Sequence, residues 1–205
     1  MTSCHNNKPL LMETIKIKDG LIHNLSYHQE RFTRSRVAIY GTTNKLNLKE
    51  YIYPPTKGLY RCRILYANNI HSVKYIPYVP KVISCLKLVS SRIDYDYKYA
   101  NRDELNSLLV NGYDDILIEK DGYITDTSIA NIAFYDGKQW VTPKNPLLKG
   151  TTRQKLIDDG FLQTRQIKPN DIYNYTQVAL MNAMIGFKII KNICITDDKG
   201  TRYDY

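Results

Sequence analysis

The stretch DILIEKDGYITD, residues 115–126, decides the fold class. Two runs of β-forming residues flank Asp121-Gly122, and an Asp-Gly pair between such runs is the strongest short-range sign of a β-hairpin. The same signature, with Asp-Gly or its equivalent at the turn, recurs in TIKIKDGLIHNL (14–25), IAFYDGKQWVT (132–142) and CITDDKGTRY (194–203). We therefore expect four antiparallel hairpins.

Helical patterns stand between the hairpins. Ser26 is the expected N-cap of the first helix, and Asn101 that of the second, where Glu104 completes a capping box. Glycines close the first and third helices. The three segments are YHQERFTRSRVAIYG (27–41), RDELNSLLVNG (102–112) and TTRQKLIDDG (151–160). The sequence thus predicts an α+β fold.

The stretch YIPYVPKVIS, residues 75–84, carries two prolines that interrupt a strand-like run. Proline is poorly tolerated inside a sheet, so we place a linker here. The prediction is a small N-terminal α+β domain over residues 1–79, with one main helix, and a larger α+β domain over residues 80–205.

Composition excludes several classes of function. The chain has 205 residues and a net charge of +9, but its 29 Lys and Arg residues are spread along the whole length and form no nucleic-acid-binding motif. No run of about 18 apolar residues predicts a membrane span, and the N-terminus lacks the apolar core of a secretory signal. We expect a cytoplasmic protein that binds neither nucleic acid nor membrane.

The four cysteines are scattered, and the four histidines show no metal-ligand spacing. The expectation is free thiols and no metal site.

Lys98 stands where the tyrosine-rich part of RIDYDYKYANRDELNSLL, residues 92–109, turns into a helical pattern. A solvated loop charge is the ordinary explanation, because Lys is among the residues least often buried. The alternative is a lysine that does chemistry.

Five separated motifs, taken in order, resemble the class IV aminotransferase family of pyridoxal-phosphate enzymes. This family includes branched-chain and D-amino-acid aminotransferases and aminodeoxychorismate lyases. The resemblance spans nearly the whole chain and implies the two-domain architecture called fold type IV. The motifs are HQERF with Arg31, KYANR with Lys98, GYITDTSIANIAF with Asp126 and Asn131, LLKGTTRQKL with Thr151 and Thr152, and ALMNAMIGF with Asn182 and Ala183.

The resemblance implies a role for each matching residue. Lys98 corresponds to the lysine that binds pyridoxal 5′-phosphate covalently and removes the substrate α-proton. Such a lysine must be deprotonated near neutral pH, which burial favours. Asp126 stands where most of the family has glutamate, opposite the pyridine nitrogen; as a simple hairpin residue it would cap the turn instead.

The phosphate and the cofactor's edge have their own candidates. Thr151 and Thr152 open a helix, whose N-terminal N–H groups suit an anion, and resemble the family's phosphate-binding pair. Arg31 matches the arginine on the other side of the phosphate. Without the resemblance, Arg31 would be an exposed helix residue and Gly150-Thr151 a plain N-cap. Asn182 and Ala183 would lie at the cofactor's edge.

The motifs KYANR and ALMNAMIGF favour the lyase branch, which implies 4-amino-4-deoxychorismate lyase, an enzyme that releases pyruvate and 4-aminobenzoate for folate biosynthesis. The alternatives are a class IV aminotransferase and a cofactor-binding relative that has lost catalysis. Arg61 and Arg63 alternate on one strand and share a face, so they either bind the carboxylates of a small anionic substrate with an amino group or face solvent. Family members are similar in forming homodimers, and we expect one here.

Overall fold

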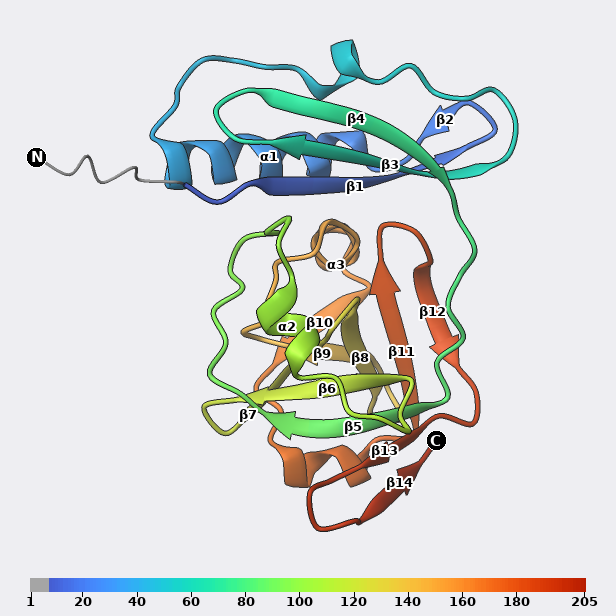
Figure 1. The fold of residues 1–205 in the computed structure, drawn as a ribbon. Coiled ribbons are helices and arrows are strands. Elements are labelled where there is room, and N and C mark those ends of the chain that lie inside the picture. The colour runs from blue at the N-terminus through green and yellow to red at the C-terminus, as the bar shows by residue number, and fades with distance from the viewer. Residues whose placement is uncertain (1–7) are drawn as a thin grey trace, which may run out of the picture. The chain divides into compact units, whose positions relative to one another are not determined.

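A computed structural model describes residues 8–205 and divides the chain into two units (Figure 1). The first unit runs to Tyr78 and also takes in Tyr97–Asn101; the second comprises Val79–Asp96 and Arg102–Tyr205. The Lys98 segment was expected in the larger C-terminal domain and belongs instead to the smaller unit.

Backbone pairing with the first strand explains where the Lys98 segment belongs. The Met12 N–H donates to the Lys98 carbonyl at 2.8 Å, and the Ala100 N–H donates to the Leu10 carbonyl at 2.9 Å. These partners are far apart in the sequence, so no local pattern marks their pairing.

The first unit is a four-stranded antiparallel sheet with one long helix. The strand order is β2-β1-β3-β4. The elements are β1 (Leu11–Lys18), β2 (Leu21–Ile22), α1 (Leu25–Tyr40), a 3-10 turn η1 (Leu48–Tyr51), β3 (Leu59–Tyr66) and β4 (Ile70–Pro77). Alternate residues of β1 point to the core, where Leu11, Ile15 and Ile17 are fully buried against Phe32 of α1.

Helix α1 begins differently from the expectation. Its N-cap is Asn24, in the left-handed conformation with φ of 51°, and Ser26 lies inside the helix. The pairing of β2 with β1 continues to His23, whose N–H donates to the Lys16 carbonyl at 3.0 Å, so the chain must reverse direction at Asn24. Asparagine tolerates that conformation. Gly41 ends the helix as predicted, with φ of 68° and its N–H on the Val37 carbonyl.

The second unit is built on a large mixed sheet. The main path is β10-β9-β8-β7-β6-β5-β13-β14, while β11 pairs with β8 and carries β12 at its other side. The strands are β5 (Cys85–Ser90), β6 (Asp115–Lys120), β7 (Tyr123–Thr127), β8 (Asn131–Tyr135), β9 (Trp140–Pro143), β10 (Leu162–Arg165), β11 (Gln177–Asn182), β12 (Gly186–Ile190), β13 (Cys194–Thr196) and β14 (Arg202–Asp204). Its core gathers apolar side chains from most of these strands.

The helices of the second unit are short: α2 (Asp103–Ser107), α3 (Thr151–Asp158) and a 3-10 helix η2 (Pro169–Asn174). The capping box predicted for Asn101 and Glu104 is wrong, because the N-cap of α2 is Arg102 and no side chain caps it. Leu105 is the one buried residue of α2, so little apolar burial favours a longer helix. No helix within residues 8–205 is both long and apolar enough to cross a membrane.

All four predicted hairpins are present: β1–β2, β6–β7, β8–β9 and β13–β14. In the first two, both turn residues have positive φ, with Asp121 at 53° and Gly122 at 84° in the β6–β7 turn. This is the geometry that an Asp-Gly pair favours. The mixed α+β fold class is as predicted.

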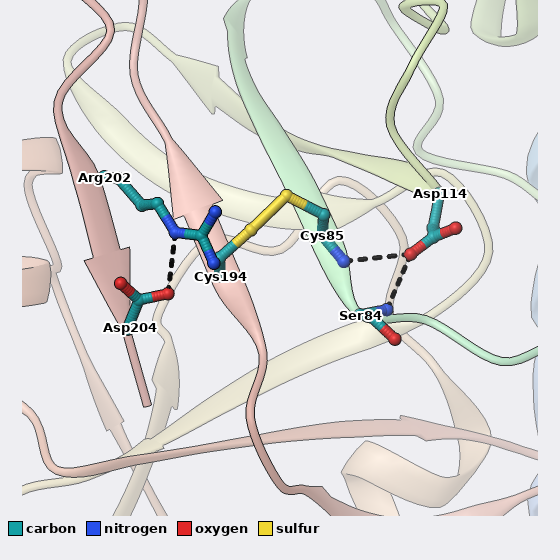
Figure 2. The surroundings of a disulfide bond; sticks show 6 residues. All are labelled: Ser84, Cys85, Asp114, Cys194, Arg202 and Asp204. Atoms are coloured by element: carbon teal, nitrogen blue, oxygen red, sulfur yellow. Dashed lines mark hydrogen bonds and ion pairs between the residues drawn. A yellow bond between two sulfur atoms is a disulfide. The ribbon is translucent and has the colours of Figure 1, made fainter.

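The expectation of free thiols is wrong for two cysteines. Cys85 and Cys194 form a disulfide between the parallel neighbours β5 and β13, in which they occupy directly paired positions (Figure 2). They are 109 residues apart in sequence, so only the sheet brings them together. Beside the bridge, Asp114 accepts the N–H groups of Ser84 and Cys85 at 2.7 and 2.9 Å. Cys62 is a buried free thiol, and Cys4 lies outside the described residues.

Candidate functional site

The end of the β7–β8 hairpin places two polar side chains opposite each other. The Thr127 N–H donates to the Ala130 carbonyl at 2.9 Å, and the Ala130 N–H donates to the Thr127 hydroxyl at 3.0 Å. This tight turn makes Asp126 and Asn131 a directly opposed pair. Both are buried, with exposed fractions of 3% and 6%.

Asp126 and Asn131 together hold the loop that precedes α3. Asn131 Nδ2 donates to Asp126 Oδ1 at 2.7 Å and to the Leu148 carbonyl at 2.8 Å. The Leu148 N–H donates to Asp126 Oδ2 at 2.8 Å. Both backbone groups of Leu148 are therefore fixed by the hairpin, and with them the path of the chain into the helix.

The Asp126 carboxyl is electrostatically unusual. Burial raises its pKa to about 6, although the hydrogen bonds from Asn131 and Leu148 and the charge of Arg153 act in the opposite direction. The donors to this carboxylate are all neutral: the Asn131 amide and the backbone N–H groups of Leu147 and Leu148. A cationic donor, such as a protonated pyridine nitrogen, would stabilise the ionised form.

The start of α3 has the features of an anion site. Thr151 and Thr152 are each 5% exposed. The Thr152 hydroxyl is buried and has no hydrogen-bond partner among residues 8–205. The first N–H groups of any helix lack intrahelical partners, and they give its N-terminus a partial positive charge. A bound phosphate would satisfy the Thr152 hydroxyl.

Gly150 is a site residue for which the sequence analysis expected no role beyond the start of the helix. A Cβ atom built on it would lie 1.9 Å from Asn131 Oδ1, so its backbone packs directly against the amide that holds Asp126. A glycine immediately before two threonines at a helix start was the available signal.

Asn182 and Ala183 lie where β11 turns into β12. Asn182 Oδ1 accepts the N–H groups of Met184 and Ile185 at 2.9 and 3.0 Å, and its Nδ2 donates to the Ile129 carbonyl at 3.1 Å. The side chain thus closes its own turn and ties it to the turn after Asp126. The second unit brings these predicted residues to neighbouring positions, and Asn182 itself has a structural role.

The first unit holds Arg31 in a buried cluster. Arg31 donates from Nε to Glu13 Oε1 at 2.9 Å and from Nη2 to Glu13 Oε2 at 2.6 Å. His28 Nδ1 lies 2.6 Å from Glu13 Oε2. Burial alone would raise the pKa of Glu13, but the charge of Arg31 and the hydrogen bonds from His28 and Arg31 lower it to about 2. Arg31 is not the exposed helix residue of the alternative reading, since its exposed fraction is 7%.

Lys98 lies beside the same cluster. The Lys98 carbonyl accepts the N–H of Met12, the residue before Glu13. The next residue, Tyr99, forms an antiparallel β-bridge with Leu11. Burial is the main cause that lowers the pKa of His28, and the charge of Lys98 contributes to it. Lys98 and Arg31 thus belong to one unit, whereas Asp126, Thr151 and Thr152 belong to the other.

Arg61 and Arg63 share the sheet face opposite the core with other cations. In the strand register Arg61 lies opposite Lys16, and Arg63 lies opposite Lys74. The Arg61 Nε atom is buried and has no hydrogen-bond partner within the described chain. These two arginines can receive anionic groups.

The residues present fit pyridoxal phosphate. The second unit by itself offers hydrogen-bond donors for a phosphate at the start of α3 and a buried carboxyl for a ring nitrogen at Asp126. The first unit by itself offers a lysine at position 98. Lys98, Arg31, Thr151 and Thr152 are residues of the types that hold such a cofactor.

Comparison with known proteins gives a consistent answer. A family model described as amino-transferase class IV matches residues 82–193. An uncharacterized protein of Haemophilus influenzae is 37% identical over 184 residues, which cover 86% of this chain and 98% of that protein. A solved structure from Haemophilus somnus, named "putative 4-amino-4-deoxychorismate lyase", is 36% identical with a TM-score of 0.81, covering 87% of this chain and 98% of that one.

A more distant structure shares the fold alone. It is the pyridoxal-phosphate-bound form of a hypothetical aminotransferase from Mycobacterium tuberculosis, at 17% identity and a TM-score of 0.75, covering 96% of this chain and 84% of that one. The predicted family and fold class are confirmed, and the predicted cofactor is the one bound in this neighbour. The chain belongs to the class IV aminotransferase family.

Proposed function

We propose that this protein is a pyridoxal-phosphate-dependent lyase that converts 4-amino-4-deoxychorismate to pyruvate and 4-aminobenzoate, a step of folate biosynthesis in the cytoplasm. One observation carries the proposal: the Haemophilus somnus structure, which is 36% identical to this chain and is matched over 98% of its own length, is named "putative 4-amino-4-deoxychorismate lyase". The motifs KYANR and ALMNAMIGF, residues 98–102 and 179–187, support the same branch.

The chain's own residues divide the work. Pyridoxal phosphate, when bound, supplies an electron sink for the substrate carbon. Lys98 Nζ removes the proton from the ring carbon that carries the amino group. The C–O bond to the enolpyruvyl group then breaks, the ring becomes aromatic, and the enolpyruvate that leaves takes up a proton to give pyruvate. Asp126, as an anion, keeps the ring nitrogen protonated, while Asn131 and the Leu148 N–H hold the carboxylate in place. Thr151, Thr152 and Arg31 bind the phosphate.

The cationic sheet face supports a small anionic substrate that carries an amino group. On β1, β3 and β4, the face opposite the core carries four neighbouring cations and no acidic residue beside them. These cations are Lys16, Arg61, Arg63 and Lys74. Two carboxylates on the substrate suit Arg61 and Arg63, because guanidinium groups bind carboxylates bidentately. We also propose a homodimer, as the family resemblance implies, which sedimentation of the wild type tests.

Product analysis tests the reaction type. The wild type, loaded with pyridoxal phosphate, is incubated with 4-amino-4-deoxychorismate and no keto acid, with the Lys98→Ala variant as control. Release of pyruvate and 4-aminobenzoate by the wild type alone is the expected result. Turnover that requires a keto-acid acceptor would instead identify a class IV aminotransferase, and cofactor binding without either reaction would identify a relative that has lost catalysis.

A further inference from the structure

We propose that Glu13 is a positioning residue, which orients the Arg31 guanidinium for the phosphate of pyridoxal phosphate. The inference rests on the proposed function and adds a residue to it. Glu13 lies in the middle of β1, and its carboxylate is fully buried.

The contact between Glu13 and Arg31 fixes the plane of the guanidinium group. Two parallel hydrogen bonds, of 2.9 and 2.6 Å, join Nε and Nη2 of Arg31 to the two carboxylate oxygens. A guanidinium has five N–H donors in a rigid planar fork, and this arrangement uses two of them on one edge. The other N–H groups point away from Glu13, in a direction set by the carboxylate.

His28 holds the carboxylate itself. Its Nδ1 lies 2.6 Å from Glu13 Oε2, so the carboxylate has a partner from α1 besides Arg31. His28 is fully buried, and burial lowers its pKa, so it is a neutral donor near pH 7. The pair of Glu13 and Arg31 therefore has no third charge from His28.

Removal of the Glu13 carboxylate would take away the counter-charge that two hydrogen bonds hold against Arg31, whose side chain is only 8% exposed. The guanidinium would then shift from its present plane, because a buried charge that loses its counter-charge is costly. The phosphate would then meet a displaced guanidinium. A structural link between β1 and α1 is the competing explanation of the cluster, and it predicts no dependence on the phosphate.

The test compares two ligands that differ in the phosphate alone. Apo Glu13→Gln is titrated with pyridoxal phosphate and with pyridoxal, and binding is followed by absorbance. We expect at least a tenfold loss of affinity for pyridoxal phosphate and a change within about twofold for pyridoxal. Glu13→Asp, which keeps the charge but shortens the side chain, is expected to fall between the wild type and Glu13→Gln.

The matched control is Arg36→Gln. Arg36 lies on the same helix, is 1% exposed, and bonds the Asn44 and Asn68 carbonyls rather than Glu13. It should reduce stability without changing the ratio of the two affinities. If Glu13→Gln is too unstable to titrate, Glu13→Asp carries the same comparison.

The outcomes separate the two ideas. Equal losses for both ligands in the Glu13 variants, as in Arg36→Gln, would overturn the positioning role and leave a structural link. A wild type that binds neither ligand would instead contradict the proposed function. Selective loss for pyridoxal phosphate, restored in part by Glu13→Asp, supports the proposal.

Discussion

Substitution of Gly150 by alanine tests whether the loop before α3 must pack closely against Asn131 of the β7–β8 hairpin. Gly150 has φ of −69° and ψ of 143°, which any residue adopts, so its backbone conformation does not require glycine. The close approach of the Gly150 backbone to Asn131 does require glycine, because an added Cβ atom would lie 1.9 Å from Asn131 Oδ1. Asn131 must move by more than 1 Å to restore ordinary contact, since real Cβ contacts essentially never lie under 3.0 Å.

The cost follows from what Asn131 holds. Its Nδ2 group makes hydrogen bonds of 2.7 and 2.8 Å to Asp126 and to the Leu148 carbonyl. Overpacking of this kind costs about 1–3 kcal/mol, and a displaced hydrogen bond adds roughly 0.5–1.5 kcal/mol. We expect Gly150→Ala to lower the free energy of unfolding by about 3 kcal/mol and to weaken binding of pyridoxal phosphate.

A double-mutant cycle with Asn131→Ala provides the control. When the Asn131 side chain is absent, Gly150→Ala has nothing to collide with and should be neutral or stabilising by about 0.4–1 kcal/mol, because alanine restricts the unfolded chain. Urea denaturation of the four proteins measures the coupling. If Gly150→Ala lowers the free energy of unfolding equally in the wild type and in Asn131→Ala, the two effects are additive and this account of the site is refuted.

Three further predictions concern the charged residues. Lys98→Ala should abolish the visible absorbance of the cofactor-loaded protein, and borohydride trapping of the cofactor on Lys87 or Lys120 would contradict the assignment. Asp126→Asn should leave cofactor binding measurable but slow proton removal, each tenfold loss corresponding to about 1.4 kcal/mol; an unaltered rate would make Asp126 a turn residue. Because the pKa of Glu13 is lowered from 4.5 to about 2, the folded state should lose about 3 kcal/mol as pH falls through that window, and acid denaturation of Glu13→Gln should lack this dependence.

Most of the correct predictions concern features that neighbouring residues in the sequence determine by themselves. The four hairpins depend on turn residues such as Asp121 and Gly122, whose positive φ values are a property of the pair itself. The end of α1 at Gly41 is of the same kind. The α+β class follows from these elements and needs no knowledge of which strands pair.

Features that depend on distant pairing could not be predicted. The Lys98 segment was assigned to the wrong unit because its partners on β1 are more than 80 residues away. The bridge between Cys85 and Cys194 requires that β5 and β13 be neighbours. Glu13 looked like an ordinary strand residue, and only the packing of α1 on β1 shows that it holds Arg31.

The bridge between Cys85 and Cys194 closes most of the second unit into a covalent ring. A single proteolytic cut anywhere between these residues, including the segment that carries Lys98, leaves two pieces that are still joined. Such a nicked protein migrates as one band on a non-reducing gel and as two after reduction. A loop of this size also restricts the unfolded chain, by an amount that chain-entropy arguments put at about 4–5 kcal/mol. A cut within the ring therefore need not release either piece of the folded protein.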